Sequence, residues 1–370
     1  MKRGWMWGGL ALASGGSLAA LVACGTSSAV DPAVSPVAEP DAGEADGGLG
    51  GAWPREAPDA ALPEAGSPVF GPEDAGAPPP PVHCTGKTGP GGDTTMTLTS
   101  SGLLRDALVH VPPSYDATTG AMLVLNFHGF MSNAPEEIIL TQMNPAADAR
   151  DFIVVYPDGV ASSWNAGTCC GTAWNDSVDD VAFTKDLLAE LGAQYCIDPA
   201  RVYATGMSNG GFFAHRLGCE MAGVFAAIAP VAGVLGIPPA QCLPSRPMPV
   251  LDFHGTADPL VPYDGGSAAS GLGGSAIVFA SVAETIATWR TRDDCTAPPS
   301  TIYSTGDATC LEYGGCAGGA VVDQCTIAGG GHTWPGGVPV PFLGATSTSI
   351  SATNTMIDFF VAHPMPAGSL

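Results

Sequence analysis

The sequence predicts an α/β protein: a mostly parallel β-sheet with helices on both faces, folded as one domain. Three observations predict this fold class. Short apolar stretches alternate with helical stretches, as in parallel sheets whose strands are joined by helices. One of these strands leads into a helix through a serine flanked by glycines. Beyond the first 24 residues, the apolar stretches are confined to residues 83–370, which is enough chain for one large domain.

The first 24 residues have the composition of an export signal. Lys2 and Arg3 form a short positive start, and residues 5–23 are mostly apolar or small. These flanks are typical of a secretory signal and not of a permanent membrane span. Residues 21–24 (LVAC) resemble the bacterial lipobox, in which the cysteine receives lipid before cleavage; the alternative is an ordinary signal peptide with an incidental cysteine. We expect lipidation at Cys24, and more than one acyl chain would give a stable anchor.

Residues 25–82 are expected to form a disordered tether. They are rich in Ala, Pro, Gly and acidic residues, with Arg55 as the only basic residue against ten acidic ones. Such a segment cannot bury enough apolar surface to offset the entropy of ordering. The prolines at 78–81 favour a semi-rigid, extended spacer next to the folded domain. We expect the tether to hold the domain away from a membrane and to carry no chemistry.

The folded domain is expected over residues 83–370. Strands are expected at residues 107–111, 122–127, 152–156, 201–205, 225–231 and 250–253. Helices are expected at residues 178–191, 210–221 and 280–290. In sheets of this kind ligands bind beyond the carboxyl ends of the strands, so functional residues are expected in the loops that follow them.

A net charge of −23 limits the partners of the chain. Only 12 Lys and Arg residues are present, which disfavours nucleic acid and electrostatic docking on anionic lipid. The charge is expected to keep an exported protein soluble. We therefore expect no nucleic-acid partner, a membrane contact only through the lipid anchor, and a monomer located outside the cell or in the cell envelope.

The clearest chemical signal is Gly-Met-Ser-Asn-Gly at residues 206–210. It follows the strand expected at 201–205 and opens the helix expected at 210–221. A serine on a sharp strand-to-helix turn exposes its hydroxyl, and flanking glycines prevent steric clashes at the turn. The helix N-terminus also favours developing negative charge. We predict Ser208 to be a nucleophile.

A serine nucleophile needs a base and an acid that orients the base. In this order of elements the acid and then the histidine follow the serine. His332 is the best-placed histidine, in the glycine-rich loop 329–337; His215, His254 and His363 are the alternatives. Asp258, in the loop after the strand at 250–253, is the expected acid, and Asp252, Asp264 and Asp294 are its rivals.

An oxyanion hole requires two backbone N–H groups. Asn209, directly after the serine, is expected to supply one. Phe130, in the loop after the strand at 122–127, is expected to supply the other, with the neighbouring His128 in a structural role. Three aromatic residues are candidate walls of a substrate pocket: Trp164, Trp174 and Trp334.

The cysteines other than Cys24 predict disulfides. They lie at positions 84, 169, 170, 196, 219, 242, 295, 310, 316 and 325. An even number in an exported chain favours up to five bridges, and the absence of Cys-x-x-Cys spacing disfavours a zinc site. Cys169 and Cys170 could bridge each other, although separate partners are more common. The four cysteines from 295 to 325 are expected to form two bridges that brace the loop of His332.

Over nearly all of residues 84–370 the chain resembles the extracellular polyhydroxybutyrate depolymerase and feruloyl esterase family of α/β-hydrolases. The matching stretches are residues 206–211 (GMSNGG), 225–233 (FAAIAPVAG), 254–263 (HGTADPLVPY), 330–337 (GGHTWPGG) and 168–173 (TCCGTA) followed by 178–181 (VDDV). The resemblance implies an α/β-hydrolase fold, a triad of Ser208, Asp258 and His332, and no metal or organic cofactor.

The resemblance also implies a serine esterase acting on feruloyl or acetyl groups of plant polysaccharide, or on polyhydroxyalkanoate esters. No substrate-binding module is recognised beside the tether, which favours feruloyl-type esters over an insoluble polyester. A polyhydroxybutyrate depolymerase proper and an acyl-peptidase are alternative enzymes. A surface lipoprotein that binds glycan or polymer without catalysis is the alternative from another class.

Overall fold

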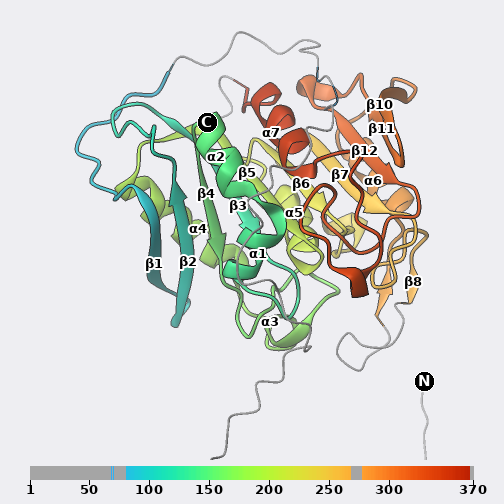
Figure 1. Cartoon of the computed structure of the whole chain (residues 1–370), viewed down its shortest axis with the longest axis horizontal. Coiled ribbons are helices and arrows are strands. Elements are labelled where there is room, and N and C mark those ends of the chain that lie inside the picture. Colours follow the sequence, from blue (N-terminus) through green and yellow to red (C-terminus); the bar gives the residue numbers. More distant parts are fainter. Residues whose placement is uncertain (1–67, 69, 71–80, 268–276, 367–370) are drawn as a thin grey trace, which may run out of the picture. The chain divides into compact units, whose positions relative to one another are not determined.

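The computed structural model describes Pro68, Phe70 and residues 81–267 and 277–366 (Figure 1). These residues form a ten-stranded sheet. Its strands, in spatial order, are β1 (Gly92–Ser100), β2 (Leu103–Val111), β4 (Phe152–Pro157), β3 (Ala121–Phe127), β5 (Ile197–Met207), β6 (Ala227–Val231), β7 (Val250–Gly255), β12 (Val322–Ile327), β11 (Ala308–Tyr313) and β10 (Ser300–Thr305). A separate short hairpin pairs β8 (Gly266–Ser267) with β9 (Val278–Phe279). The expected signal and Cys24 lie outside the described residues.

The centre of the sheet is parallel and both margins are antiparallel. Strands β4, β3, β5, β6, β7 and β12 run parallel to their neighbours within this set. The β1–β2 hairpin joins β4 on one side, and the β10–β11 hairpin joins β12 on the other, each through antiparallel pairing. The mostly parallel sheet expected from the sequence is thereby confirmed.

Helices cover both faces of the sheet. Helices α4 (Asp180–Gln194), α5 (Asn209–Glu220) and α6 (Val282–Arg292) contribute buried side chains to one core cluster. Helices α1 (Ala134–Thr141), α2 (Met143–Arg150) and α7 (Ala352–Ala362) contribute to the other, and the short α3 is Gly171–Asn175. Successive side chains of β3 point into opposite clusters, as a strand requires: Leu123 and Leu125 join the first, Met122 and Val124 the second. This double burial explains why the central strands are continuous apolar stretches.

The six expected strands and three expected helices are all present, with shifted ends. The expectations missed the outer strands β1, β10 and β11, the parallel strand β12, the short strands β8 and β9, and the helices α1, α2, α3 and α7. Within the segment expected as a tether, Phe70 packs edge-on against Phe359 of α7, with ring centroids 5.4 Å apart. No helix among the described residues is long and apolar enough to cross a membrane.

Five disulfides join the ten cysteines. The pairs are Cys84–Cys196, Cys169–Cys170, Cys219–Cys242, Cys295–Cys316 and Cys310–Cys325. The number confirms the expectation, but separate partners for Cys169 and Cys170 were wrong. These two cysteines are bonded to each other, and both are buried in the core cluster that includes Trp164. The last four cysteines form two bridges, as expected.

Candidate active site

Ser208 occupies the sharp turn between β5 and α5. Its backbone has φ 56° and ψ −121°, a region that side-chain-bearing residues rarely adopt. The turn leaves no room for side chains beside it, because a Cβ on Gly206 or Gly210 would lie 2.4 or 1.9 Å from the Phe127 carbonyl oxygen. Ser208 is the N-cap residue of α5, but its hydroxyl makes no capping hydrogen bond. The strand–serine–helix geometry predicted from the sequence is present.

The order of the strands brings three predicted residues together at the carboxyl ends of the parallel strands. Ser208 follows β5, Asp258 follows β7 and His332 follows β12, and these strands belong to the parallel centre of the sheet. The carboxyl ends of parallel strands lie at the same edge, so the three loops are neighbours. The loops after β7 and β12 contact each other directly, because the Ala257 N–H donates to the Gly330 carbonyl at 2.9 Å.

Asp258 and His332 form a buried hydrogen-bonded pair. His332 Nδ1 and Asp258 Oδ2 lie 2.7 Å apart. The other carboxylate oxygen accepts the backbone N–H groups of Leu260 and Val261, each at 2.8 Å. Burial alone would raise the pKa of Asp258, but His332, His254 and the Val261 N–H favour the ionised form and lower its pKa below the usual value. An ionised Asp258 fixes the His332 tautomer with its proton on Nδ1, which leaves Nε2 free to accept a proton.

The histidine loop is held by its own backbone. The His332 N–H donates to the Leu343 carbonyl at 2.8 Å, and the Gly331 N–H donates to the Ala345 carbonyl at 2.9 Å. A Cβ on Gly331 would lie 2.3 Å from the Leu343 oxygen, so this approach requires glycine. Among the described contacts, Ser208 Oγ and His332 Nε2 do not form a hydrogen bond. Such bonds are often long in free enzymes and tighten with substrate.

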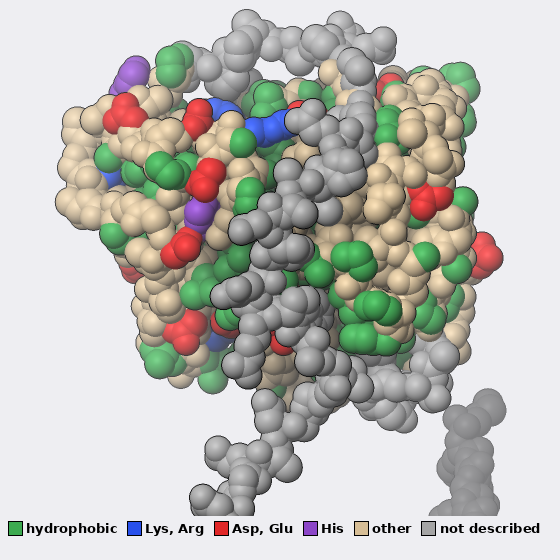
Figure 2. Space-filling view, in the orientation of Figure 1, with side chains coloured by type: hydrophobic (Ala, Val, Ile, Leu, Met, Phe, Trp, Pro, Cys, Tyr) green, Lys and Arg blue, Asp and Glu red, His purple; other side chains and the backbone are tan. Residues whose placement is uncertain are grey.

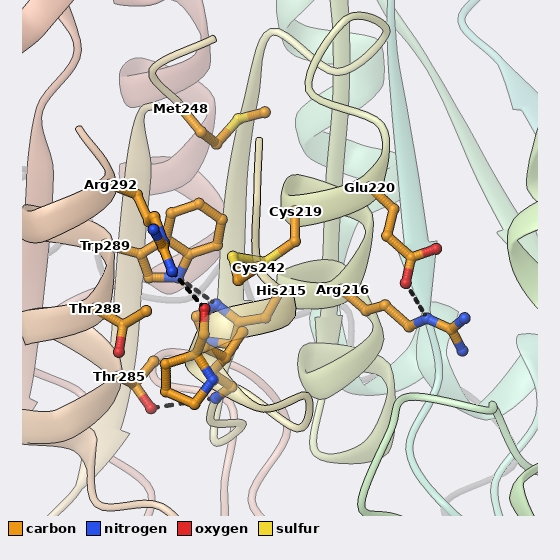
Figure 3. The surroundings of a disulfide bond; sticks show 12 residues. His215, Arg216, Cys219, Glu220, Cys242, Met248, Thr285, Thr288, Trp289 and Arg292 are labelled. Carbon is orange, nitrogen blue, oxygen red and sulfur yellow. Dashed lines mark hydrogen bonds and ion pairs between the residues drawn. A yellow bond between two sulfur atoms is a disulfide. The ribbon is translucent and has the colours of Figure 1, made fainter. Parts of the chain in front are cut away.

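The alternative histidines and acids have other contacts. His215, on α5, accepts the Trp289 indole N–H at 3.0 Å (Figure 3), and its Nε2 lies 3.6 Å from Asp252 Oδ1. His363 Nδ1 donates to the Phe359 carbonyl on α7. His254 Nε2 donates to the Val261 carbonyl and lies 3.5 Å from Asp258 Oδ2. His254 therefore supports the loop of Asp258, in keeping with a structural role for this histidine directly after a strand.

The loop after β3 adjoins the serine. A Cβ on Gly129 would lie 3.5 Å from Ser208 Cβ. His128 Nδ1 donates to the Gly129 carbonyl at 2.7 Å, and its Nε2 accepts the Gly159 N–H at 3.0 Å. Acceptance by Nε2 requires the neutral ring, and burial lowers the pKa of His128, which favours that form. The Gly129 carbonyl and the Phe130 N–H belong to one peptide unit, so His128 fixes the orientation of the donor expected from Phe130.

Asn209 has a second role that the sequence did not predict. Its backbone N–H is at the start of α5, where helical N–H groups lack intrahelical partners. Its fully buried side chain accepts the Trp164 N–H at 2.7 Å and donates to the carbonyls of Trp164 and Cys169, each at 3.1 Å. The carboxamide thereby ties the serine turn to the loop that precedes α3.

Two of the three expected pocket tryptophans do not reach a surface. Trp164 and Trp334 have 0% exposed area, because Trp164 packs between Phe183 and Phe213 and Trp334 lies in the second core cluster. The expectation that these two line a pocket is wrong for this structure. Trp174, on α3, is 38% exposed and stays a candidate for substrate contact.

One cavity of the described chain lies away from the predicted triad. It measures ≈ 250 Å³ and is lined by β1 and β2 residues including Asp93 and His110, together with Ile138 and Tyr156. None of its lining residues belongs to the predicted triad or oxyanion hole, so the catalytic assignment depends on the loop geometry and not on cavity size. Among the described residues, no cluster of His, Cys, Asp and Glu is arranged to hold a metal ion.

Comparisons of this chain with a family model and with known proteins agree on one family of esterases. Residues 106–265 match the family described as esterase PHB depolymerase. Feruloyl esterase B of Piromyces equi is 35% identical over 235 residues, covering 62% of this chain and 42% of that protein. "Putative esterase NocK" of Nocardia uniformis subsp. tsuyamanensis is 35% identical over 289 residues, covering 72% of this chain and 82% of that protein. The chain thus spans less than half of the first relative and most of the second.

A solved structure supports the fold. The crystal structure of native sOPH superposes with a TM-score of 0.50 at 18% identity, covering 78% of this chain and 91% of that one. At this identity the likeness concerns the fold alone.

Proposed function

Because this chain belongs to the esterase PHB depolymerase family of carboxylic ester hydrolases, we propose that it cleaves esters through Ser208, His332 and Asp258. The observation that carries the proposal is the buried 2.7 Å hydrogen bond between Asp258 and His332, at the sheet edge that also presents Ser208. A carboxylate–imidazole pair within reach of a serine hydroxyl is the arrangement that activates serine.

The proposed reaction has two acyl-transfer steps. His332 Nε2 accepts the Ser208 proton as Oγ attacks the ester carbonyl, and Asp258 stabilises the resulting imidazolium. The N–H groups of Asn209 and Phe130 donate to the oxyanion. Collapse of the tetrahedral intermediate breaks the ester C–O bond, and the imidazolium protonates the departing alcohol. Water, deprotonated by the same histidine, then attacks the acyl carbon. Collapse of this second tetrahedral intermediate breaks the bond to Ser208 Oγ, which takes the proton back from the imidazolium, and the acid is released.

Ser208→Ala tests the nucleophile. Loss of the hydroxyl should lower kcat for p-nitrophenyl acetate by about 10⁴-fold or more, because no other residue can form the acyl-enzyme. Ser304→Ala, at an exposed position on the edge strand β10, is the matched control and should retain wild-type turnover. Wild-type turnover in Ser208→Ala, or no ester hydrolysis by the unaltered protein, would refute the proposal.

For the substrate, we propose feruloyl or acetyl esters of plant polysaccharide. Similarity to a feruloyl esterase supports this choice, and the partly exposed Trp174 offers an aromatic face for a phenolic acyl group. A side-by-side assay on methyl ferulate, acetylated xylan and polyhydroxybutyrate film separates the candidates. Faster hydrolysis of the film than of both other substrates would favour a polyhydroxybutyrate depolymerase instead.

A non-catalytic surface protein that binds glycan is the alternative from another class. A fluorophosphonate probe distinguishes the two, because it labels only an activated serine. We also propose that the enzyme acts as a monomer outside the cell or in the cell envelope, with lipid on Cys24 as its only membrane contact. The five disulfides support an oxidising location. Figure 2 shows scattered acidic and few basic side chains on the visible face, which suits neither nucleic acid nor anionic lipid.

A further inference from the structure

Trp164 joins the two segments that would supply the oxyanion donors. Its backbone N–H and carbonyl are both bonded to the Asn209 carboxamide, at 2.7 and 3.1 Å. Its indole N–H donates to the His128 carbonyl at 2.9 Å. Asn209 is the residue after the nucleophile, and His128 lies two positions before Phe130. A single residue, 36 positions from His128 and 45 from Asn209, therefore contacts both sides of the proposed oxyanion hole.

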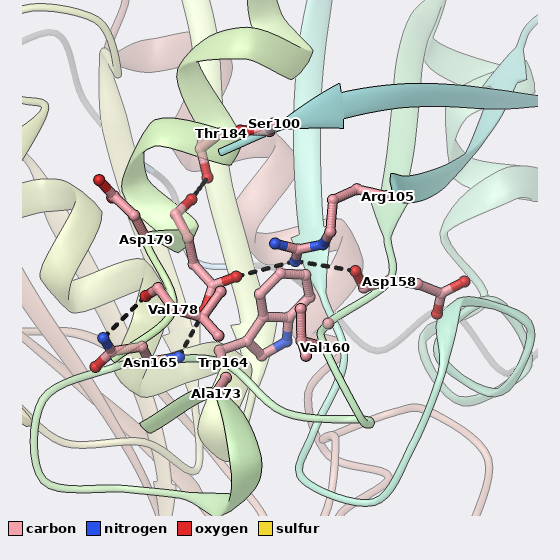
Figure 4. A network of polar contacts seen from close by, with 12 residues as sticks. Ser100, Arg105, Asp158, Val160, Trp164, Asn165, Ala173, Val178, Asp179 and Thr184 are labelled. Atoms are coloured by element: carbon pink, nitrogen blue, oxygen red, sulfur yellow. Dashed lines mark hydrogen bonds and ion pairs between the residues drawn. The ribbon is translucent and has the colours of Figure 1, made fainter. Parts of the chain in front are cut away.

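The indole ring itself has little freedom to move. It is fully buried and nearly parallel to the rings of Phe213 and Phe183, with centroids 5.4 and 6.4 Å away. Phe127, the last residue of β3, meets it edge-on at 5.1 Å. The guanidinium of Arg105 lies 5.7 Å from the ring centroid (Figure 4). Close packing of this kind fixes where the indole N–H points.

The backbone on the far side of Trp164 is also anchored. The Asn165 N–H donates to Asp180 Oδ2 at 2.8 Å, and Asp180 is paired with Arg105 at 2.9 Å, with both side chains almost fully buried (Figure 4). Arg105 also donates to the Asp158 carbonyl at 3.1 Å. The loop of Trp164 is therefore fixed to β2 and α4 independently of its contacts with the serine turn, so it can act as a rigid reference for the two donor segments.

We propose that Trp164 is a positioning residue that sets the separation of the two oxyanion donors, the N–H groups of Asn209 and Phe130. This inference rests on the proposed esterase function and extends it to a residue that touches no substrate. Donors to an oxyanion act only when they are correctly placed, and removing a whole donor lowers kcat by about 10²–10³-fold. Without the indole bond, the His128 carbonyl would lose its contact with Trp164, and the peptide units from His128 to Phe130 could shift. The distance between the Phe130 N–H and the Asn209 N–H would then no longer be fixed through Trp164.

Trp164→Phe tests the inference, with Trp289→Phe as the matched control. Both residues are fully buried and each donates one indole hydrogen bond, Trp289 to His215 Nδ1 at 3.0 Å (Figure 3). Trp289 lies on α6, and its indole bond contacts neither the Asn209 carboxamide nor the His128 carbonyl. Trp164→Phe should lower kcat for p-nitrophenyl acetate about tenfold with KM within about twofold of wild type, a smaller loss than removal of a whole donor. Both variants should lower thermal stability by similar amounts, but Trp289→Phe should retain wild-type kcat.

A trifluoromethyl ketone gives the readout that a merely structural role would not change. Its adduct with Ser208 carries an oxyanion, so the inhibition constant should rise in Trp164→Phe by the factor that kcat/KM falls, and should not rise in Trp289→Phe. Equal kcat and equal inhibition in the two variants would overturn the inference. If Trp164→Phe does not fold, benzothienylalanine at position 164, which keeps the ring shape and replaces the N–H by sulfur, gives the same test.

Ser208→Ala keeps the two claims separate. Suppose that esterase activity is abolished in Ser208→Ala but is equal in the two tryptophan variants. This result would leave the proposed function intact and refute only the role of Trp164. Absence of esterase activity in the unaltered protein would instead refute the proposed function, on which this role depends.

Discussion

The carboxylate of Asp258 is the group on which the state of the proposed base depends. Asp258→Asn keeps the shape and can still accept the N–H groups of Leu260 and Val261. Its amide would, however, present a donor to His332 Nδ1 and favour the tautomer with the proton on Nε2. We expect kcat at neutral pH to fall by about 10⁴-fold while circular dichroism stays native. Asp264→Asn, at an exposed position in the same loop, should retain activity, and near-wild-type turnover in Asp258→Asn would contradict the assignment.

The residues of the candidate triad were predictable from their positions, whereas their supports were not. Ser208, Asp258 and His332 each follow a strand or lie in a glycine-rich loop, and these are local features of the sequence. The Asn209 carboxamide bonds to Trp164, a residue 45 positions away, and no local pattern encodes such a contact. Trp164 was predicted to contact substrate because aromatic rings suit a phenolic pocket, but the same property makes them core residues, and packing against Phe183 and Phe213 decides the outcome.

Asp293 should make global stability depend on pH. Burial raises its pKa to about 7, although the Met248 N–H and Arg246 oppose the shift. The folded protein therefore binds a proton there up to about pH 7, whereas the unfolded chain releases it near pH 4. Because the native state binds more protons between these values, the free energy of unfolding should fall as pH rises from about 4 to about 7, by at most on the order of 4 kcal/mol.

Asp293→Asn should remove this dependence, because the amide oxygen still accepts the Met248 N–H without ionising. Urea unfolding at about pH 5 and about pH 8, on either side of the raised pKa, checks it: the variant should gain stability relative to wild type at the higher pH. The exposed neighbour Asp294, changed to Asn, should follow wild type at both values. Parallel behaviour of Asp293→Asn and wild type would show that the buried carboxyl does not titrate in this range.

At the scale of elements, the antiparallel margins of the sheet and the last parallel strand, β12, were harder to predict than the other central strands. The predicted central strands are buried on both faces and contain long apolar stretches, so their composition identifies them. Strand β1 alternates exposed threonines with buried residues, so it lacks a continuous apolar stretch. Strand β12 contains the buried polar residues Asp323 and Gln324, and its composition is therefore similar to that of a loop. The strand that leads to His332 was therefore missed, although the sequence had singled out this histidine as a candidate base.

The Cys310–Cys325 bridge gives a prediction about the elements behind the histidine. It joins β11 to β12 at paired positions and closes 15 residues. Replacing both cysteines by alanine should lower the free energy of unfolding by about 3 kcal/mol, because the unfolded chain gains freedom. We expect kcat of the folded protein at room temperature to stay near the wild-type value, since Gly330, Gly331 and His332 keep their backbone bonds.

The control for this prediction is the Cys219–Cys242 pair, which closes 23 residues between the far end of α5 and the segment after β6 (Figure 3). Its removal should cost a similar amount of stability and also leave kcat unchanged. A large loss of kcat confined to the Cys310/Cys325 variant, in protein shown to be folded, would mean that the bridge positions His332 as well as stabilising the sheet.

For the whole molecule, the order of strands matters more than any single element. Ser208 and His332 are 124 positions apart, the difference of their residue numbers, and only the adjacency of β5, β6, β7 and β12 places their loops at one edge. The sequence indicated an α/β sheet through its alternation of elements, but pairing order depends on long-range contacts. Chain order Ser–Asp–His supplied the missing constraint, because it is the order expected when a serine turn opens an α/β-hydrolase helix.

The last prediction concerns the whole chain and tests the lipid anchor proposed at Cys24. Lipid at Cys24 would bury several acyl chains, each CH₂ contributing about 0.8 kcal/mol, which is sufficient for stable anchoring when more than one chain is attached. In a bacterium that processes lipoproteins, the full chain should incorporate labelled palmitate and sediment with membranes. Cys24→Ala should lose the label and leave the membrane fraction with its esterase activity intact, whereas Ser27→Ala should behave as wild type. Continued labelling of Cys24→Ala would place the lipid elsewhere, and an unlabelled wild-type chain in the medium would identify residues 1–24 as an ordinary signal peptide.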